Sequence, residues 1–165
     1  MVEAIRETLV STVLNIFETM FFTFLEPLEG TSDEDSFPSK DSEAARWLTA
    51  DIRFNGGQSG SLSIYLPWEL GEVMAQNFLG FEEDRVMEEQ VNDMARELAN
   101  MVCGNLFSTL DKNKKGIVFL DTPKSRMIGD LEKKGEISPG DMVAEFASED
   151  KVVTVVLRRD AVPTP

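Results

Sequence analysis

The sequence contains no histidine and only one cysteine, Cys103, among its 165 residues. The absence of histidine excludes Ser/His/Asp triads, phosphohistidine transfer and nearly all zinc sites. A lone cysteine cannot form a disulfide within the chain, which fits a reducing, cytoplasmic location. Because no histidine is present to activate it, Cys103 is expected to be a buried structural thiol rather than a nucleophile.

The chain also lacks the phosphate-binding signatures GxxxxGK[ST] and GxGxxG, so it is not expected to have a nucleotide site of its own. Basic residues are few, 16 against 30 acidic ones, which gives a net charge of −14. This charge argues against nucleic acid and anionic membrane surfaces as partners, since both require cationic side chains. It permits a partner with a basic rim, although an acidic surface also simply favours solubility. Any chemistry must use carboxylates and amides, or groups that a partner supplies.

The N-terminal segment is not expected to be a signal peptide. Charged residues interrupt it from position 3 onward, and the uncharged run 8–17 is too short to span a bilayer. Apolar residues instead recur at steps of three and four from Val2 to about Leu25, which predicts a helix stopped by Pro27. We expect its aromatic end, FETMFFTFLEPL, to be buried in the core or against a partner subunit.

Antiparallel hairpins and two more helices are expected in the rest of the chain. The runs RWLTADIRF and GSLSIYLP alternate in polarity and flank Asn55-Gly56-Gly57, which favours a hairpin turn. A helix is expected at 68–80, with Pro67 as a first helical residue and Gly80 as its C-terminal cap. Another is expected from about Asp84 to Leu110. The runs GIVFL, MVAEFAS and KVVTVVLR are expected to be strands, and TPKSRMIG a loop.

These elements predict an α+β fold with an antiparallel or mixed sheet and long helices packed on it. No Gly/Ser linker divides the chain, so residues 1–165 are expected to form a single domain. Within it, residues 29–43 are expected to be an acidic surface loop and residues 160–165 a tail.

A polar strip is expected along the helix at 84–110. On a helical wheel, with about 100° per residue, the apolar side chains share one face and four other residues lie beside it. These four are Asp93, Glu97, Asn100 and Gly104. Glycine inside a helix is less favourable than alanine by about 1 kcal/mol. Its presence here suggests the close approach of another chain.

A glutamate followed three residues later by an asparagine is weak evidence alone, because the helix contains two such pairs. The wider pattern resembles the signature of the CheC/CheX/FliY family of chemotaxis phosphatases. That signature is an acid or serine, three residues, Glu, two residues, Asn, 22 residues and Pro, and this chain matches every position. The matching residues are Asp93, Glu97, Asn100 and Pro123. The rival pair, Glu89 and Asn92, does not match, because Arg85 and Lys115 occupy the outer positions.

The resemblance extends over roughly residues 1–160. Residues 55–80 resemble the family's glycine-rich hairpin that leads into a helix, and residues 122–129 resemble its loop after the site helix. A single signature makes the chain more similar to CheX than to CheC, which carries a second signature on its first helix. Here Glu18 on the first helix is followed three residues later by Phe21.

The resemblance implies a hydrolase of two-component signalling, a phosphatase for the aspartyl phosphate of a CheY-like response regulator. It implies that Asn100 positions a water for in-line attack and that Glu97 pairs with a lysine of the receiver domain. No cofactor of the chain's own is expected, since the receiver supplies Mg²⁺. Asp93, Gly104 and Pro123 are expected to be supporting residues: Asp93 caps the helix, tunes it or adds solubility, and Pro123 shapes the adjacent loop.

Two alternatives of other classes remain open. The same fold can bind a receiver or a flagellar-switch partner without turnover, or it can serve as a structural dimer module. CheX-like proteins dimerise through their sheets, so a homodimer is expected.

Overall fold

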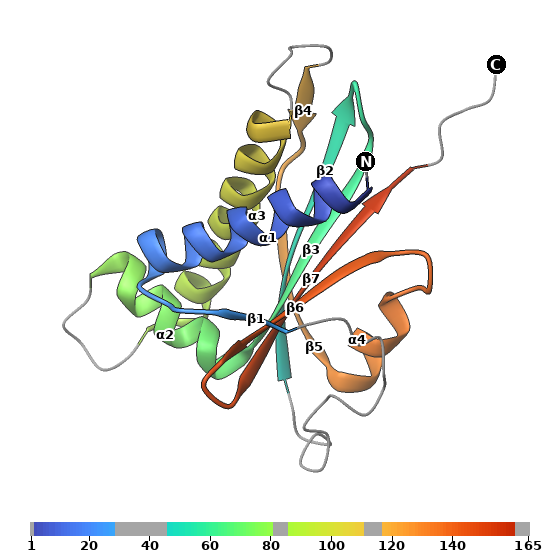
Figure 1. Ribbon diagram of the computed structural model, residues 1–165. Helices are drawn as coiled ribbons and strands as arrows, with labels where there is room; N and C mark the ends of the chain where they lie inside the picture. The colour runs from blue at the N-terminus through green and yellow to red at the C-terminus, as the bar shows by residue number, and fades with distance from the viewer. Residues whose placement is uncertain (1, 29–45, 81–85, 111–116, 161–165) are drawn as a thin grey trace.

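The computed structural model describes residues 2–28, 46–80, 86–110 and 117–160. A seven-stranded antiparallel sheet lies between a layer of three helices and one short helix, as Figure 1 shows. In chain order the elements are α1 (Val2–Phe21), β1 (Glu26–Leu28), β2 (Arg46–Gly56), β3 (Gly60–Pro67), α2 (Trp68–Leu79), α3 (Glu88–Leu110), β4 (Val118–Leu120), β5 (Lys124–Gly129), α4 (Asp130–Glu136), β6 (Met142–Ser148) and β7 (Lys151–Arg159). The α+β fold predicted from the sequence is therefore confirmed.

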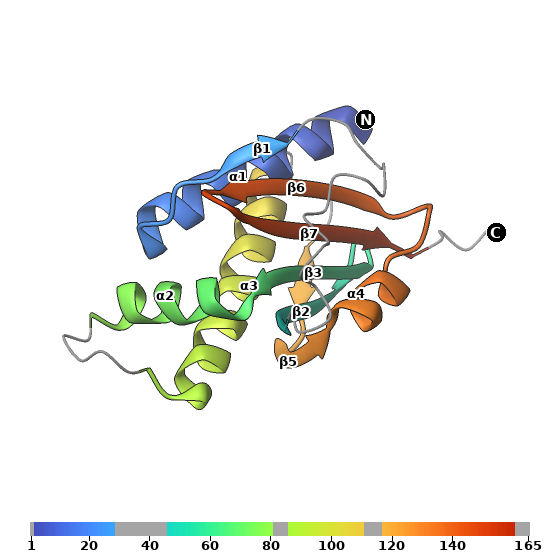
Figure 2. The same cartoon turned by 90° about the horizontal axis from the view of Figure 1, so that it is seen from below.

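The sheet has the strand order β1-β6-β7-β3-β2-β4, and β5 also pairs with β2 (Figure 2). Residues 54–56 of β2 pair with β4, and residues 46–51 pair with β5. Two residues of β2, Ile52 and Arg53, therefore face three residues, 121–123, that belong to neither strand. One extra residue on one strand is a β-bulge, so β4 and β5 form one edge of the sheet, interrupted by this bulge.

The main core lies between the sheet and the layer of α1, α2 and α3. Alternate residues of β2, including Ile52 and Phe54, point into it, and the ring centroid of Phe54 lies 4.4 Å from that of Phe107 on α3. The intervening β2 residues point to the opposite face, where α4 covers a smaller cluster that includes Trp47 and Tyr65. This alternation follows from the two-residue period of a strand.

The first helix ends at Phe21, earlier than the predicted Leu25. Phe22 adopts a φ of +51°, and the N–H of Thr23 donates to the carbonyl of Phe17 at 2.9 Å, a pattern that closes a helix. The prediction that Pro27 stops the helix is wrong, because Pro27 lies in β1. There it occupies a sheet edge, where a missing N–H is tolerated.

The aromatic end of α1 is only partly buried. Phe21 is fully buried, its ring centroid 5.1 Å from that of Phe78, whereas Phe22 and Phe24 are 68% and 70% exposed. Of the two alternatives expected for this segment, burial in the core is therefore wrong for Phe22 and Phe24, and burial against a partner subunit stays a prediction.

The β2–β3 hairpin forms as predicted, but its turn does not lie at Asn55-Gly56. Both residues belong to β2 and pair with β4. Gly56 has a φ of +127°, and a Cβ built on it would lie 2.2 Å from the carbonyl oxygen of Ile117. Glycine is thus required by the close approach of the strand beside it, and the chain turns at residues 57–59.

Helix α2 ends as predicted, because Gly80 has a φ of +67° and its N–H donates to the carbonyl of Gln76 at 3.0 Å. Pro67 occupies the N-cap position rather than the first helical one. Helix α3 begins at Glu88, and residue 84 lies outside the described residues.

Two elements correct the prediction for the second half of the chain. The segment 122–129 is not a loop throughout, because 124–129 form the edge strand β5. Helix α4 was not predicted. The predicted loop at 29–43 and most of the tail at 160–165 lie outside the described residues. In the part that is described, no helix has the length and apolar character needed to cross a membrane.

Candidate functional site

Helix α3 is held by one broad buried face. Nine of its residues are buried, from Val91 through Phe107, and they pack against α1, α2 and the sheet. This face is wider than the apolar face predicted from the sequence, because Ala99, Cys103, Leu106 and Phe107 are buried as well. On a helical wheel with about 100° per residue, the centre of this buried face lies opposite the polar strip. The sequence had predicted that the strip lies beside the apolar face. The strip therefore forms the outward side of the helix.

The polar strip is accessible along its length. Asp93, Glu97 and Asn100 are exposed, and Gly104 is half-buried beside Leu120 of β4. Within the described part of the chain, the side chains of Glu97 and Asn100 have no hydrogen-bond or ion-pair partner. Both are therefore available to an external molecule, one turn apart on a rigid helix.

Asp93 differs from its neighbours on the strip because it has a partner. Arg96, three residues later, donates a hydrogen bond from its guanidinium to the Asp93 carboxylate. Arg96 is also the only basic residue of α3. This pairing fits the local role expected for Asp93 and leaves the centre of the strip to Glu97 and Asn100.

The rival Glu/Asn pair is used inside the fold. Asn92 donates from Nδ2 to the carbonyl of Glu88 at 3.0 Å, and its Oδ1 accepts from the hydroxyl of Ser125 on β5 at 2.7 Å. One donor and one acceptor position of the Asn92 amide are thus occupied within the fold, whereas the Asn100 amide has no partner in the described part of the chain. The structure thus distinguishes two pairs that have the same spacing in the sequence.

Pro123 lies in the bulge between β4 and β5. Proline is tolerated at such a position because the edge has no continuous hydrogen-bond ladder there. The bulge is anchored on the sheet side by the N–H of Asp121, which donates to the carbonyl of Arg53 at 2.8 Å. Pro123 therefore lies in the edge of the sheet that runs beside α3, and its supporting role stays a prediction.

Three residues of the polar strip and Pro123 are the parts of the chain that match the sequence signature. The sequence model of the family described as "Chemotaxis phosphatase CheX" matches residues 48–147, a range that contains the whole signature. The chain belongs to the CheX family. No curated protein sequence matches the chain.

Solved structures of CheX-family proteins and their relatives share the fold. A chemotaxis protein CheX from Vibrio vulnificus aligns with a TM-score of 0.70 and 21% identity, covering 93% of this chain and 95% of that one. A CheC-like superfamily protein from Shewanella sp. PV-4 aligns with a TM-score of 0.69 and 22% identity, covering 95% and 97%. The CheX of Borrelia burgdorferi, solved in a complex with CheY, BeF₃ and Mg²⁺, aligns with a TM-score of 0.65 and 17% identity, covering 94% and 97%.

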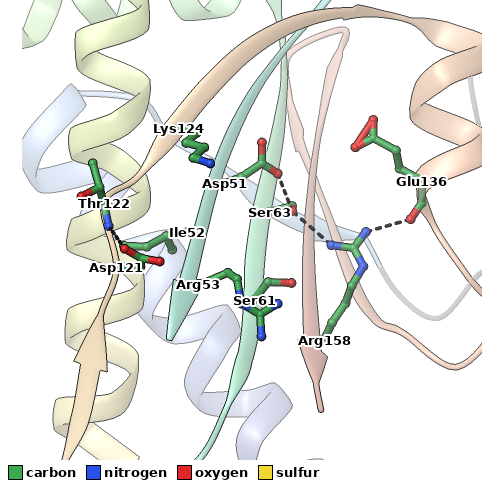
Figure 3. A pocket seen from close by; sticks show the side chains of 10 residues that line it. All are labelled: Asp51, Ile52, Arg53, Ser61, Ser63, Asp121, Thr122, Lys124, Glu136 and Arg158. Atoms are coloured by element: carbon green, nitrogen blue, oxygen red, sulfur yellow. Dashed lines mark hydrogen bonds between the residues drawn. The ribbon is translucent and has the colours of Figure 1, made fainter. Parts of the chain in front are cut away.

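A polar hollow lies on the sheet face opposite α3 in this CheX-family chain (Figure 3). It has a volume of about 330 Å³. Its charges are largely satisfied within the protein: Ser63 donates to Asp51 at 2.6 Å, and Arg158 donates to Ser63 at 3.1 Å and to the carbonyl of Glu136 at 2.9 Å. The hollow thus belongs to a network that holds α4 against the sheet. The sequence carries no local signal for this network, because strand register alone brings its members together.

Proposed function

We propose that this protein dephosphorylates the aspartyl phosphate of a CheY-like response regulator. The observation that carries the proposal is the exposed, unpartnered pair Glu97 and Asn100 on the outward side of α3, in the described part of the chain. Membership of the CheX family supports it. The Borrelia burgdorferi relative, solved with CheY, supports a receiver as the partner.

An aspartyl phosphate is an acyl phosphate and is already reactive. The remaining requirement is a water molecule placed in line with the phosphorus–oxygen bond, in a site that holds still. The carboxamide of Asn100 suits this task, because its oxygen accepts a hydrogen bond from the water while its nitrogen donates to a phosphoryl oxygen. Neither interaction depends on a titrating group, which fits a chain without histidine.

The proposed role of Glu97 is docking rather than base catalysis. It lies one turn before Asn100, and its exposed carboxylate would pair with the lysine of the receiver. A loose, metaphosphate-like transition state requires little proton abstraction from the water, so a general base adds little. The Mg²⁺ of this reaction would be held by the receiver, and none of the steps assigned to this chain requires a metal ligand from it.

The test is phosphate release from a phosphorylated CheY-like receiver domain with and without the protein. Asn100→Ala is expected to abolish the acceleration while the melting temperature does not fall, since the side chain has no hydrogen bond or ion pair within the described fold and alanine is a good helix former. Asn105→Ala is a matched control, because Asn105 is also exposed on α3 and bonds only the carbonyl of Met101, at 2.7 Å. Full activity of the Asn100 variant would reject the proposal.

The amount of protein needed distinguishes catalysis from binding. A phosphatase accelerates decay at far less than one equivalent per receiver, whereas a binding module affects at most the receivers it occupies. Acceleration that rises only up to one equivalent would favour the non-catalytic alternative.

We also propose that the protein forms a homodimer through the apolar surface at the end of α1. Four large apolar side chains within nine residues of the chain are exposed: Met20, Phe22, Phe24 and Leu28. Exposed apolar surface of this kind is typical of interfaces, and the adjacent β1 is an edge strand. Sedimentation at micromolar concentration is expected to give twice the chain mass of 18.4 kDa, and Phe24→Ser to weaken association. A species of single-chain mass only would contradict the dimer.

A further inference from the structure

The amide of Asn92 links the site helix to the edge of the sheet. Its Nδ2 is committed to the carbonyl of Glu88, which fixes the orientation of the amide and directs Oδ1 at the hydroxyl of Ser125. Ser125 faces the helices because it pairs with Ala50, one of the β2 residues that point into the main core. In the described ranges, this is the only side-chain hydrogen bond between α3 and the sheet.

The bulge with Pro123 lies between two contacts with α3. On one side Leu120 lies against Gly104, and on the other Ser125 bonds Asn92. Twelve residues of helix span about 18 Å, and five residues of extended chain span about 17 Å. The two segments therefore run antiparallel at nearly equal length. The bulge passes the turn of α3 that carries Glu97 and Asn100.

Little else holds β5 against α3. On the face toward the helices, β5 presents Ser125, Met127 and Gly129, and Met127 is partly exposed. Its one buried apolar residue, Ile128, packs on the other face of the sheet with Trp47 and Tyr65. Without the Ser125–Asn92 bond, β5 would keep its pairing with β2 but would have no side-chain hydrogen bond to α3, in the described part of the chain.

We propose that Asn92 and Ser125 are positioning residues for the phosphatase reaction, an inference that rests on the proposed function. Their hydrogen bond fixes the Pro123 bulge beside Glu97 and Asn100, so that helix and bulge meet the receiver as one rigid surface. Asn92 thus has a different task from Asn100: it sets the shape of the docking surface and does not touch the substrate.

The test compares Ser125→Ala, Asn92→Ala and the double variant in the receiver dephosphorylation assay. Each single variant is expected to raise KM about fivefold, in keeping with the loss of one hydrogen bond, while kcat changes less than twofold because Asn100 stays on its helix. The double variant is expected to be no worse than either single one, since all three lack the same bond. Ser125→Thr keeps the hydroxyl and is expected to restore the original KM.

Thr49→Val is the matched control for a loss of stability. Thr49 is buried on the opposite face of the sheet, where its hydroxyl oxygen accepts from the N–H of Arg126 at 3.2 Å and its hydroxyl donates to Asp51 at 3.0 Å. Its replacement weakens the anchoring of β5 without touching α3. The melting temperature should fall while KM stays unchanged.

A second readout is independent of catalysis. Exchange of the Asp121 amide hydrogen reports on the bulge, because this N–H is bonded to Arg53. It is expected to be faster in Ser125→Ala and unchanged in Ser125→Thr. The inference would be overturned if Ser125→Ala lowers the melting temperature but changes neither the exchange of the Asp121 amide hydrogen nor KM. The bond would then stabilise the fold without positioning the bulge. If the unmodified protein fails to accelerate receiver dephosphorylation, the proposed function fails and the inference falls with it, so the two failures are distinguishable.

Discussion

Leu120 lies against Gly104 but leaves space for a methyl group on it. A Cβ built on Gly104 would be 3.7 Å from Cδ1 of Leu120, an ordinary van der Waals distance. The fold therefore accommodates alanine at this position, although glycine inside a helix is less favourable by about 1 kcal/mol. Gly104 also lies on the outward side of α3, one turn beyond Asn100. The reason for glycine is thus expected to come from a molecule that approaches the strip.

Gly104→Ala should separate stability from docking. The free energy of unfolding is expected to rise by about 1 kcal/mol, because alanine is the better helix former, while KM for the phosphorylated receiver rises. Urea unfolding and the phosphate-release assay measure the two effects. Gly135→Ala in α4 is the control, since a Cβ there has nothing within 4 Å and lies far from the strip in the sequence. A more stable variant with an unchanged KM would show that the bare backbone serves no partner.

Glu97→Ala is expected to raise KM and to lower kcat, so that kcat/KM falls on the order of tenfold or more. The reason is that hydrogen bonds to charged groups contribute about 1.5–3 kcal/mol. The receiver assay at varied substrate concentration measures both constants. Glu89→Ala removes an exposed carboxylate from the same helix outside the strip and should leave both unchanged. A normal KM in the Glu97 variant would argue against its docking role.

Asp93→Ala is expected to change kcat/KM less than about twofold and to destabilise α3 by no more than about 0.5 kcal/mol, the usual contribution of an exposed pair at this spacing. The physical reason is that the Asp93 carboxylate already accepts from Arg96. Thermal unfolding and the receiver assay test the two expectations. A loss of tenfold or more in activity without a change in melting temperature would assign Asp93 a direct part in the reaction.

Periodicity was sufficient to predict α3 and the residues of its polar strip, because a long helix with one buried face repeats its pattern many times. It did not predict how wide the buried face is, and so it placed the strip beside that face and not opposite it. The edge strand β5 has no such pattern. Only one of its six residues, Ile128, is buried, and its pairing is with residues of β2 more than 70 positions earlier. Helix α4, with seven residues, is too short to show a helical period.

The spatial position of Pro123 likewise depends on non-local contacts. The signature gives its distance from Asn100 along the chain, but the bulge that places it arises where β2 changes partner from β5 to β4. The hydrogen bond between Ser125 and Asn92 connects residues 33 positions apart and joins an edge strand to a helix. The residues next to Asn92 and Ser125 in the sequence do not indicate this hydrogen bond. Local sequence therefore does not show that the Asn92 side chain is bonded within the fold while the Asn100 side chain is exposed.

Lys133 of α4 provides a prediction for the pH dependence of stability. Its side chain is buried, and Nζ lies 3.6 Å from the ring centroid of Trp47. Burial lowers the pKa of Lys133 to about 8, although Glu145 on β6 and Asp130 on α4 favour the charged form. The unfolded chain would keep its ordinary value of 10.5. Between these two values the unfolded state binds more protons than the native state, so this group makes stability rise with pH.

Lys133→Met removes that titration. The difference in unfolding free energy between the original protein and the variant is expected to shift by about 1 kcal/mol in favour of the original between pH 8 and pH 9. Urea unfolding at pH 7, 8 and 9 measures it. Burial raises the pKa of Cys103 to about 12. This makes stability fall as the pH rises above 9.0, the ordinary pKa of the thiol. The contribution is the same in both proteins and cancels in the difference. A difference that stays constant across this range would mean that the Lys133 ammonium keeps its proton at pH 9 and that Glu145 and Asp130 outweigh the effect of burial.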